Sequence, residues 1–152
     1  MKQKLFLLLI LLSSFATYAQ DLSLNQLIEI QNKDLDYAKK VLSAKGWEFL
    51  DYNKDNYEST FGFHPDGSGN AENYFTYKND PAQGVEVTIA VKTKALYNEH
   101  IKALLANKFE LISSEPNGDN TVRLYENSTH SVRTISSYSN DISYFIISEK
   151  TN

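Results

Sequence analysis

Apolar residues recur at helical spacing near the start of the chain. Ser23-Leu24-Asn25-Gln26 fits a capping box, which predicts a helix that begins just after Ser23. Asn32-Lys33-Asp34 is a break, with Asp34 as a new N-cap ahead of a second amphipathic stripe. Gly46 follows where a helix C-terminus favours a left-handed residue. The pattern predicts two short consecutive helices, or one kinked helix, over residues 24–45.

From Trp47 onward the apolar pattern mostly has a period of two, which is typical of strands. The cleanest alternation is that of Val85, Val87, Ile89 and Val91 with polar or small residues. Turn residues, such as those at 116–120 and 127–129 and a further turn expected at 138–141, separate the apolar segments. The segments that predict strands are 47–50, 61–63, 74–77, 85–91, 109–114, 121–126, 131–136 and 142–149. Another helix is expected from about Ala95 to Asn107, with a buried stripe of Leu96, Ile101, Leu104 and Leu105.

This order of elements predicts an α+β fold in which helices pack on one face of one or more antiparallel sheets. Residues 41–50 also align with residues 104–112, with Gly46 left unmatched. The alignment suggests two helix-plus-strands repeats, with halves at 20–94 and 95–152. The alternative is that any helix-to-strand junction has this pattern, in which case residues 20–152 are one domain without a repeat.

The first residues have the sequence of a secretory signal peptide. A basic start is followed by the apolar run Leu5–Leu12 and by Thr17-Tyr18-Ala19, which has small residues at the positions that a signal peptidase reads. The apolar run is too short for a membrane span, because eight helical residues cover only about 12 Å. We therefore expect cleavage after Ala19 and an exported chain, periplasmic or extracellular, with no membrane insertion afterwards.

Charge and composition narrow the classes of partner. The chain of 152 residues has 15 Lys and Arg against 19 Asp and Glu, and cleavage after Ala19 would remove Lys2 and Lys4, giving a net charge of −6. An acidic protein repels phosphates, so nucleic acid is an unfavourable partner. The chain has no cysteine. Outside the cytoplasm it would therefore depend on packing alone for its stability.

The sequence has no recognisable arrangement of catalytic or metal-binding residues. His64, His100 and His130 fall on different predicted elements, and no histidine pair has the spacing of a zinc site. Asp51-x-Asn53-x-Asp55 resembles the start of a calcium loop, but Asn56 replaces the required glycine and Gly62 the required glutamate. A polar hairpin turn explains this segment better. We predict no metal, no cofactor and no enzyme activity.

Aromatic residues are the remaining signal, because ten Tyr and eight Phe gather in predicted strands and turns. One interpretation is an exposed aromatic face that contacts a protein or a glycan. The other is cross-strand packing within the sheet. On the first interpretation, the candidate binding residues are Tyr52, Tyr57, Tyr74, Phe75 and Tyr77. Residues 74–77 place aromatics on both faces of one strand, and residues 142–147 are apolar on both faces, which predicts a central strand.

Three segments carry a resemblance to known proteins. Tyr18-Ala19-Gln20, the opening DLSLNQLIEIQ at 21–31 and Lys45-Gly46-Trp47-Glu48-Phe49 resemble small uncharacterised exported proteins of Bacteroidota, flavobacteria especially. That resemblance implies no activity. Two helices followed by a small antiparallel sheet are also similar to the half-domain of β-lactamase-inhibitor-protein-like folds and of small outer-membrane-assembly lipoproteins. Those families bind proteins and do no chemistry, and this chain lacks the lipoprotein cysteine.

These observations favour a non-catalytic exported domain that binds a protein partner, of the inhibitor, immunity or envelope-assembly type. The alternative is a module that binds a small ligand or glycan through its exposed aromatics. A hydrolase is the third class, and it would require a histidine beside a carboxylate in a cleft.

Overall fold

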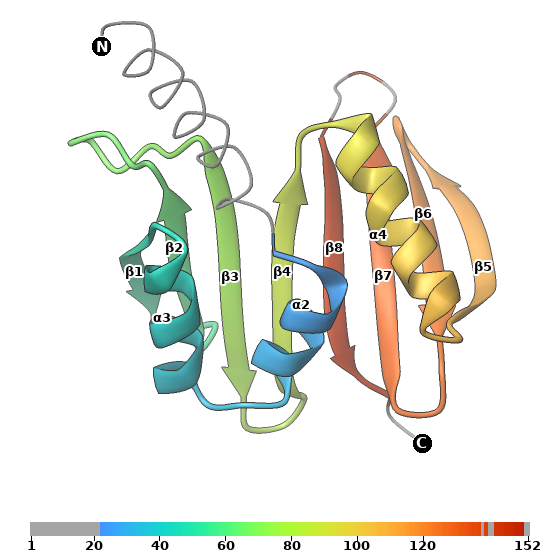
Figure 1. Cartoon of the computed structure of the whole chain (residues 1–152), viewed down its shortest axis with the longest axis horizontal. Helices are drawn as coiled ribbons and strands as arrows, with labels where there is room; N and C mark the ends of the chain where they lie inside the picture. The colour runs from blue at the N-terminus through green and yellow to red at the C-terminus, as the bar shows by residue number, and fades with distance from the viewer. Residues whose placement is uncertain (1–21, 138, 140–141, 151–152) are drawn as a thin grey trace, which may run out of the picture.

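The computed structural model describes residues 22–137, 139 and 142–150 (Figure 1). The expected signal peptide at 1–19 lies outside the described residues, as does most of the expected turn at 138–141. The described chain forms three helices and a single sheet of eight strands, which confirms the predicted α+β class.

Two separate helices open the fold, as the first of the two alternatives predicted. Helix α2 spans Leu24–Gln31 and helix α3 spans Leu35–Ala44. The capping box at α2 is confirmed, since the Ser23 hydroxyl accepts from the backbone N–H of Gln26 and the Gln26 side chain accepts from the Ser23 N–H. Asp34 caps α3 by accepting from the Tyr37 N–H at 2.9 Å. Both caps satisfy N–H groups that the first helical turn leaves without partners.

Helix α4 spans Lys94–Ala106, one residue earlier than expected, because Thr93 is its N-cap and accepts from the Leu96 N–H. The buried positions of α4 are His100 and Leu104. The prediction that Leu105 belongs to the buried stripe is wrong, since its side chain is 60% exposed. Leu104 alone occupies the inward position of the last turn, and Leu105 points roughly 100° away from it.

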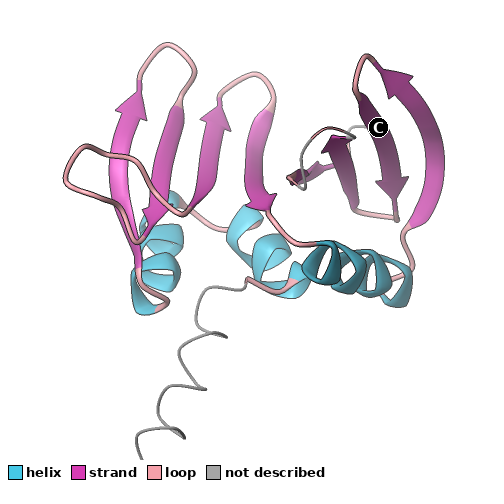
Figure 2. Cartoon of the chain, turned by 90° about the horizontal axis from the view of Figure 1, so that it is seen from above, coloured by secondary structure: helices cyan, strands magenta, loops and turns pink. Residues whose placement is uncertain are grey.

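All eight strands run antiparallel to their neighbours, in the order β1-β2-β3-β4-β8-β7-β6-β5. Figure 2 shows that the three helices lie on the same side of this sheet. The last strand of each half, β4 and β8, pair with each other and join the halves. The strands are β1 Trp47–Asn53, β2 Glu58–Phe63, β3 Asn73–Asp80, β4 Gly84–Val91, β5 Glu110–Asn117, β6 Asn120–Glu126, β7 His130–Ser137 and β8 Ser143–Glu149.

The hydrophobic core lies between the helices and the sheet. Alternate residues of the central strands point toward the helices, and α2 packs across β4 and β8 where they meet. Helix α3 packs on β1, and α4 contributes Tyr97 and His100, whose rings contact Phe145 of β8. The fully buried large side chains include Trp47, Phe61, Phe75, Tyr77, Phe109, Phe145, Leu24, Leu27 and Ile30.

The two halves repeat the same geometry. Two residues beyond the end of α3 and of α4 lies a residue with positive φ, Gly46 (84°) and Lys108 (60°) respectively. In each case a buried aromatic follows and leads into an edge strand. Each edge strand then breaks register at one bulge, at Leu50 in β1 and at Ile112 in β5. Gly46 is therefore matched by Lys108, and leaving it unmatched in the sequence alignment was wrong. A common origin of the halves stays a prediction.

Helix α2 has no counterpart in the second half, and polar groups fix its C-terminal end. The Gln31 side chain donates to the carbonyl of Val85 at 3.1 Å, and its oxygen lies 3.1 Å from Nε2 of His130. The Tyr77 hydroxyl donates to the carbonyl of Lys33 at 2.6 Å. These bonds tie the end of α2 to β4 and β7, and the turn after α2 to β3, so that this helix contacts both halves.

We predict that Leu27→Ala destabilises the whole domain by about 2–5 kcal/mol, because Leu27 is fully buried where α2 covers β4 and β8. Urea unfolding followed by tryptophan fluorescence measures the change. The matched control is Asn25→Ala on the exposed side of α2, which should change stability by less than about 0.5 kcal/mol. Equal effects of the two substitutions would contradict the packing described above.

Candidate functional site

The face of the sheet opposite the helices is not covered by any of the helices that the structure describes (Figure 2). Because side chains alternate along a strand, the residues between the core positions point to this open face. In β4, Val87, Ile89 and Val91 are buried against the helices, so Thr88 and Ala90 lie on the open face. Antiparallel sheets commonly expose such a face to water, and its side chains are then mostly polar.

The middle of the open face is apolar instead. Ala90 of β4 pairs with Tyr144 of β8, Tyr144 pairs with Ile135 of β7, and Ile135 pairs with Val122 of β6. Ile146 and Leu124 lie in the next row, on either side of Arg133. With Tyr74 of β3, these residues form a continuous strip across five strands. We call this strip the apolar belt: Tyr74, Ala90, Tyr144, Ile135, Val122, Ile146 and Leu124.

Two tyrosines are the most exposed residues of the belt. The register that pairs Phe75 with Ile89 places Tyr74 opposite Ala90, so that Tyr74 and Tyr144 flank Ala90 on its two sides. Their side chains are 37% and 42% exposed, whereas Ala90 is only 6% exposed. Neighbouring strands are about 4.8 Å apart, which separates the backbones of the two tyrosines by about 10 Å. The result is a shallow trough with an alanine floor and aromatic walls.

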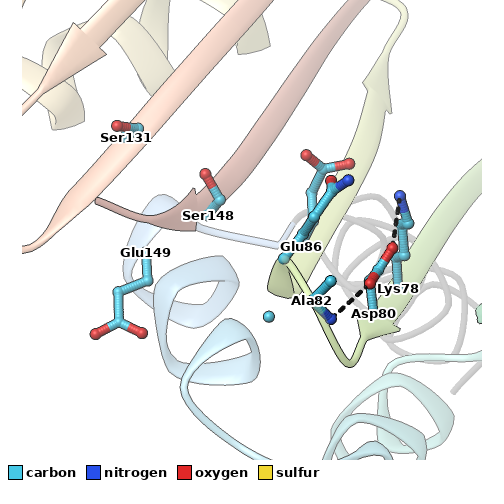
Figure 3. Close-up of a pocket in the computed structure, with 9 residues that line it drawn as sticks. Lys78, Asp80, Ala82, Glu86, Ser131, Ser148 and Glu149 are labelled. Atoms are coloured by element: carbon cyan, nitrogen blue, oxygen red, sulfur yellow. Dashed lines mark hydrogen bonds and ion pairs between the residues drawn. The ribbon is translucent and has the colours of Figure 1, made fainter. Parts of the chain in front are cut away.

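One end of the open face is acidic. A continuous row of paired positions crosses six strands there, and it contains Glu58, Lys78, Glu86, Ser148, Ser131 and Glu126. Figure 3 shows the middle of this row, where a hollow of about 350 Å³ is lined also by Asp80 and Glu149. Lys78 lies 3.9 Å from Asp80, and a hydrogen bond from Lys150 holds the pKa of Glu126 below its usual range. We call this row the acidic row.

The structure separates the five aromatic residues predicted as binding residues. Tyr74 lies on the open face, and Tyr52 and Tyr57 are exposed on the β1–β2 hairpin, outside the apolar belt. The prediction that Phe75 and Tyr77 are surface residues is wrong, since they are 0% and 1% exposed. Both occupy helix-facing positions of β3, and the Tyr77 hydroxyl donates a hydrogen bond to the carbonyl of Lys33 inside the fold.

Sequence reasoning left most of the belt out of the candidate site. Tyr144 and Ile146 belong to a segment that was predicted as a central strand because it is apolar on both faces, and β8 is central. That signal could have identified them, because a strand with one face on the core has no packing reason to be apolar on the other. Val122 and Ile135 lie in strands of ordinary alternation and carry no such signal.

The three histidines are distributed over separate parts of the fold. His64 is exposed beside Glu72, at 3.4 Å. His100 is buried, with its ring nitrogens 3.0 Å from the carbonyl oxygen of Leu96 and 3.1 Å from that of Leu22. His130 lies against Gln31. Among the residues that the structure describes, no three His, Asp or Glu side chains form a group that could hold a metal ion.

The segment that resembles a calcium loop is a hairpin turn between β1 and β2. The side-chain oxygen of Asn53 accepts from the backbone N–H groups of Asp55 and Asn56, at 3.0 and 3.3 Å. This oxygen therefore closes the turn.

Comparison of the chain with protein-family models, with curated proteins and with solved structures found no match. In the described part of the chain, no helix has the length and apolar character needed to cross a bilayer.

We predict that protonation of His130 destabilises the fold below pH 6.5. Burial lowers the pKa of this imidazole from its ordinary value of 6.5, and the carboxylate of Glu149 only partly offsets this effect. The unfolded chain therefore takes up the proton more readily than the folded chain. The stability that His130 contributes is complete above about pH 6.5 and is lost as the pH falls toward the lowered pKa of the folded state.

Urea midpoints measured between pH 7.5 and 5.5 test this prediction. The wild-type midpoint should fall with pH, and His130→Asn should flatten the profile. The control His64→Asn changes an exposed imidazole and should keep the wild-type slope. If the urea midpoint of His130→Asn falls with pH as steeply as that of the wild type, a group other than His130 causes the loss of stability, and the prediction is wrong.

Proposed function

We propose that this chain is an exported, non-catalytic domain that binds a protein partner on the open face of its sheet. The observation that carries the proposal is the apolar belt, because it crosses five strands on the face opposite the three described helices. Contiguous exposed apolar surface on a water-soluble domain is typical of an interaction site. The predicted signal peptide supports a role outside the cytoplasm.

The belt has the anatomy of a protein interface. Tyrosine is enriched among the residues that dominate binding energy, and such residues lie near the centre of an interface within a ring of weaker contacts. Tyr74 and Tyr144 stand on either side of the Ala90 floor, where one large side chain of a partner could fit between them. Less exposed aliphatic residues continue the belt beyond Tyr144 on β7 and β6.

Charge indicates what kind of partner fits. The acidic row borders the belt on one side. The acidic residues in and beside it (Glu58, Glu86, Glu126, Asp80 and Glu149) outnumber the basic residues nearby (Lys78, Lys150 and Arg133). A partner with an apolar centre and a basic edge would match both features, and charge of this kind raises the association rate. The belt is also built on paired strands, so little conformational entropy is lost when it binds.

A binding experiment with purified components tests the proposal. The chain from residue 20 is used to recover partners from an envelope extract, and the dissociation constant of the purified complex is then measured by calorimetry. We expect Tyr144→Ala to weaken binding at least tenfold, which corresponds to about 1.4 kcal/mol. Tyr57→Ala, on the exposed β1–β2 hairpin, is the matched control and should bind as the wild type does.

Recovery of no specific partner would count against the proposal. Wild-type affinity in Tyr144→Ala together with lost affinity in Tyr57→Ala would move the site to the hairpin. Circular dichroism of each variant separates a lost contact from a lost fold.

A glycan is the second candidate ligand, and the two exposed tyrosines favour it. Sugar rings stack on aromatic faces, and the trough between Tyr74 and Tyr144 is open and shallow. An array of oligosaccharides distinguishes the two candidates. Binding to a defined glycan that Tyr144→Ala abolishes, with no protein recovered, would favour the glycan.

A further inference from the structure

A second hollow lies on the helix side of the sheet, away from the apolar belt. Its volume is about 210 Å³, and it lies where α4 begins above β6, β7 and β8. Lys94 and Tyr97 of α4, Arg123 of β6, Ser136 of β7 and Ser143 of β8 line it. We call it the cationic pocket, because its charged lining residues are a lysine and an arginine.

The described residues around this pocket do not balance its positive charge. Among the described residues, neither Arg123 nor Lys94 lies within ion-pair distance of a carboxylate. The guanidinium of Arg123 donates to the hydroxyl of Tyr97 at 3.0 Å, and this single bond uses one of its five donors. In a chain with an excess of acidic residues, a half-buried arginine would be expected to pair with one of them.

The first half of the chain shows that the fold does not require this charge. Helix α3 begins with Asp34 as its cap and Asp36 in its first turn, which is the favourable sign at the positive end of a helix dipole. Helix α4 has no acidic residue in its first turn and has Lys94 there instead. In β2, the position that corresponds to Arg123 is Ser59, when the two edge hairpins are aligned on their bulges.

We propose that the cationic pocket binds a tetrahedral oxyanion, a phosphate or sulfate group. The donors come from four elements, which suits an anion with oxygens in several directions better than a planar carboxylate. Arginine binds such groups through two parallel N–H bonds, and a lysine adds a point charge. The hydroxyl of Ser143 donates to that of Ser136 at 3.1 Å, which leaves the Ser136 proton free to reach an anion.

The proposal is independent of the proposed function, because the pocket and the belt lie on opposite faces of the sheet. Arg123 points to the helix side, whereas its neighbours Val122 and Leu124 belong to the belt. Loss of anion binding and loss of partner binding can therefore be measured separately.

Thermal unfolding and calorimetry with inorganic phosphate test the proposal. At fixed ionic strength, replacing chloride by phosphate at about ten times its dissociation constant should raise the unfolding midpoint by about 5 °C. Arg123→Gln should lose at least tenfold in affinity, and Lys94→Gln should lose a smaller factor. The matched controls are Arg133→Gln on the open face and Lys102→Gln on the exposed side of α4, and both should keep wild-type affinity.

Further ligands identify the form of the anion. Sulfate should bind about as well as phosphate, and acetate more weakly. Glycerol phosphate tests whether the pocket accepts an ester or only the free ion. Amide chemical shifts of Ser136 and Ser143 should move on titration. No midpoint shift in the wild type, an equal shift in Arg123→Gln, or acetate binding as tightly as phosphate would overturn the proposal.

Discussion

The pairing of β4 with β8 is the interaction on which the rest of the structure depends. Among the described strands, this ladder alone joins the two halves of the sheet, and its helix-facing pairs, Val87 with Ile147 and Ile89 with Phe145, are buried. Helix α2 covers this ladder, with Leu27 and Ile30 in the core. No disulfide can reinforce it, because the chain has no cysteine. Packing across this β4–β8 junction therefore holds the two halves together.

The same ladder creates the candidate binding face. Tyr144 and Ile146 reach the open side only because β8 is inserted between β4 and β7. Without that strand order, the apolar belt would be split into two parts. Tyr74 and Ala90 would lie near the edge of one sheet, and Ile135 and Val122 near the edge of another. The helix side, by contrast, differs between the halves, since α3 begins with acids and α4 begins beside Lys94 and Arg123. The proposed interface thus depends on the junction, and the proposed anion site on the second half alone.

Local features of this fold could be predicted from the sequence. The capping box at Ser23, the cap at Asp34 and the alternation of 85–91 all act over a few residues, and each gave the observed element. Alternation also shows that Phe75 and Tyr77 share a face of β3. It does not show which face the helices cover, because that depends on distant segments. Both residues were therefore candidates for binding on the interpretation of an exposed aromatic face. The match of Gly46 to Lys108 was missed because a lysine in a left-handed conformation has no sequence signature. The order of strands at the junction depends on contacts between residues far apart in the chain, which periodicity does not report.

Native-state hydrogen exchange of the β4 and β8 amides tests the central claim most directly. If the junction holds one cooperative unit together, these amides exchange only when the whole domain unfolds. Their exchange free energy then equals the unfolding free energy measured in urea. An exchange free energy for β4 and β8 clearly below that of β2, β3 and β7 would contradict the account, because it would mean that the halves separate while each remains folded.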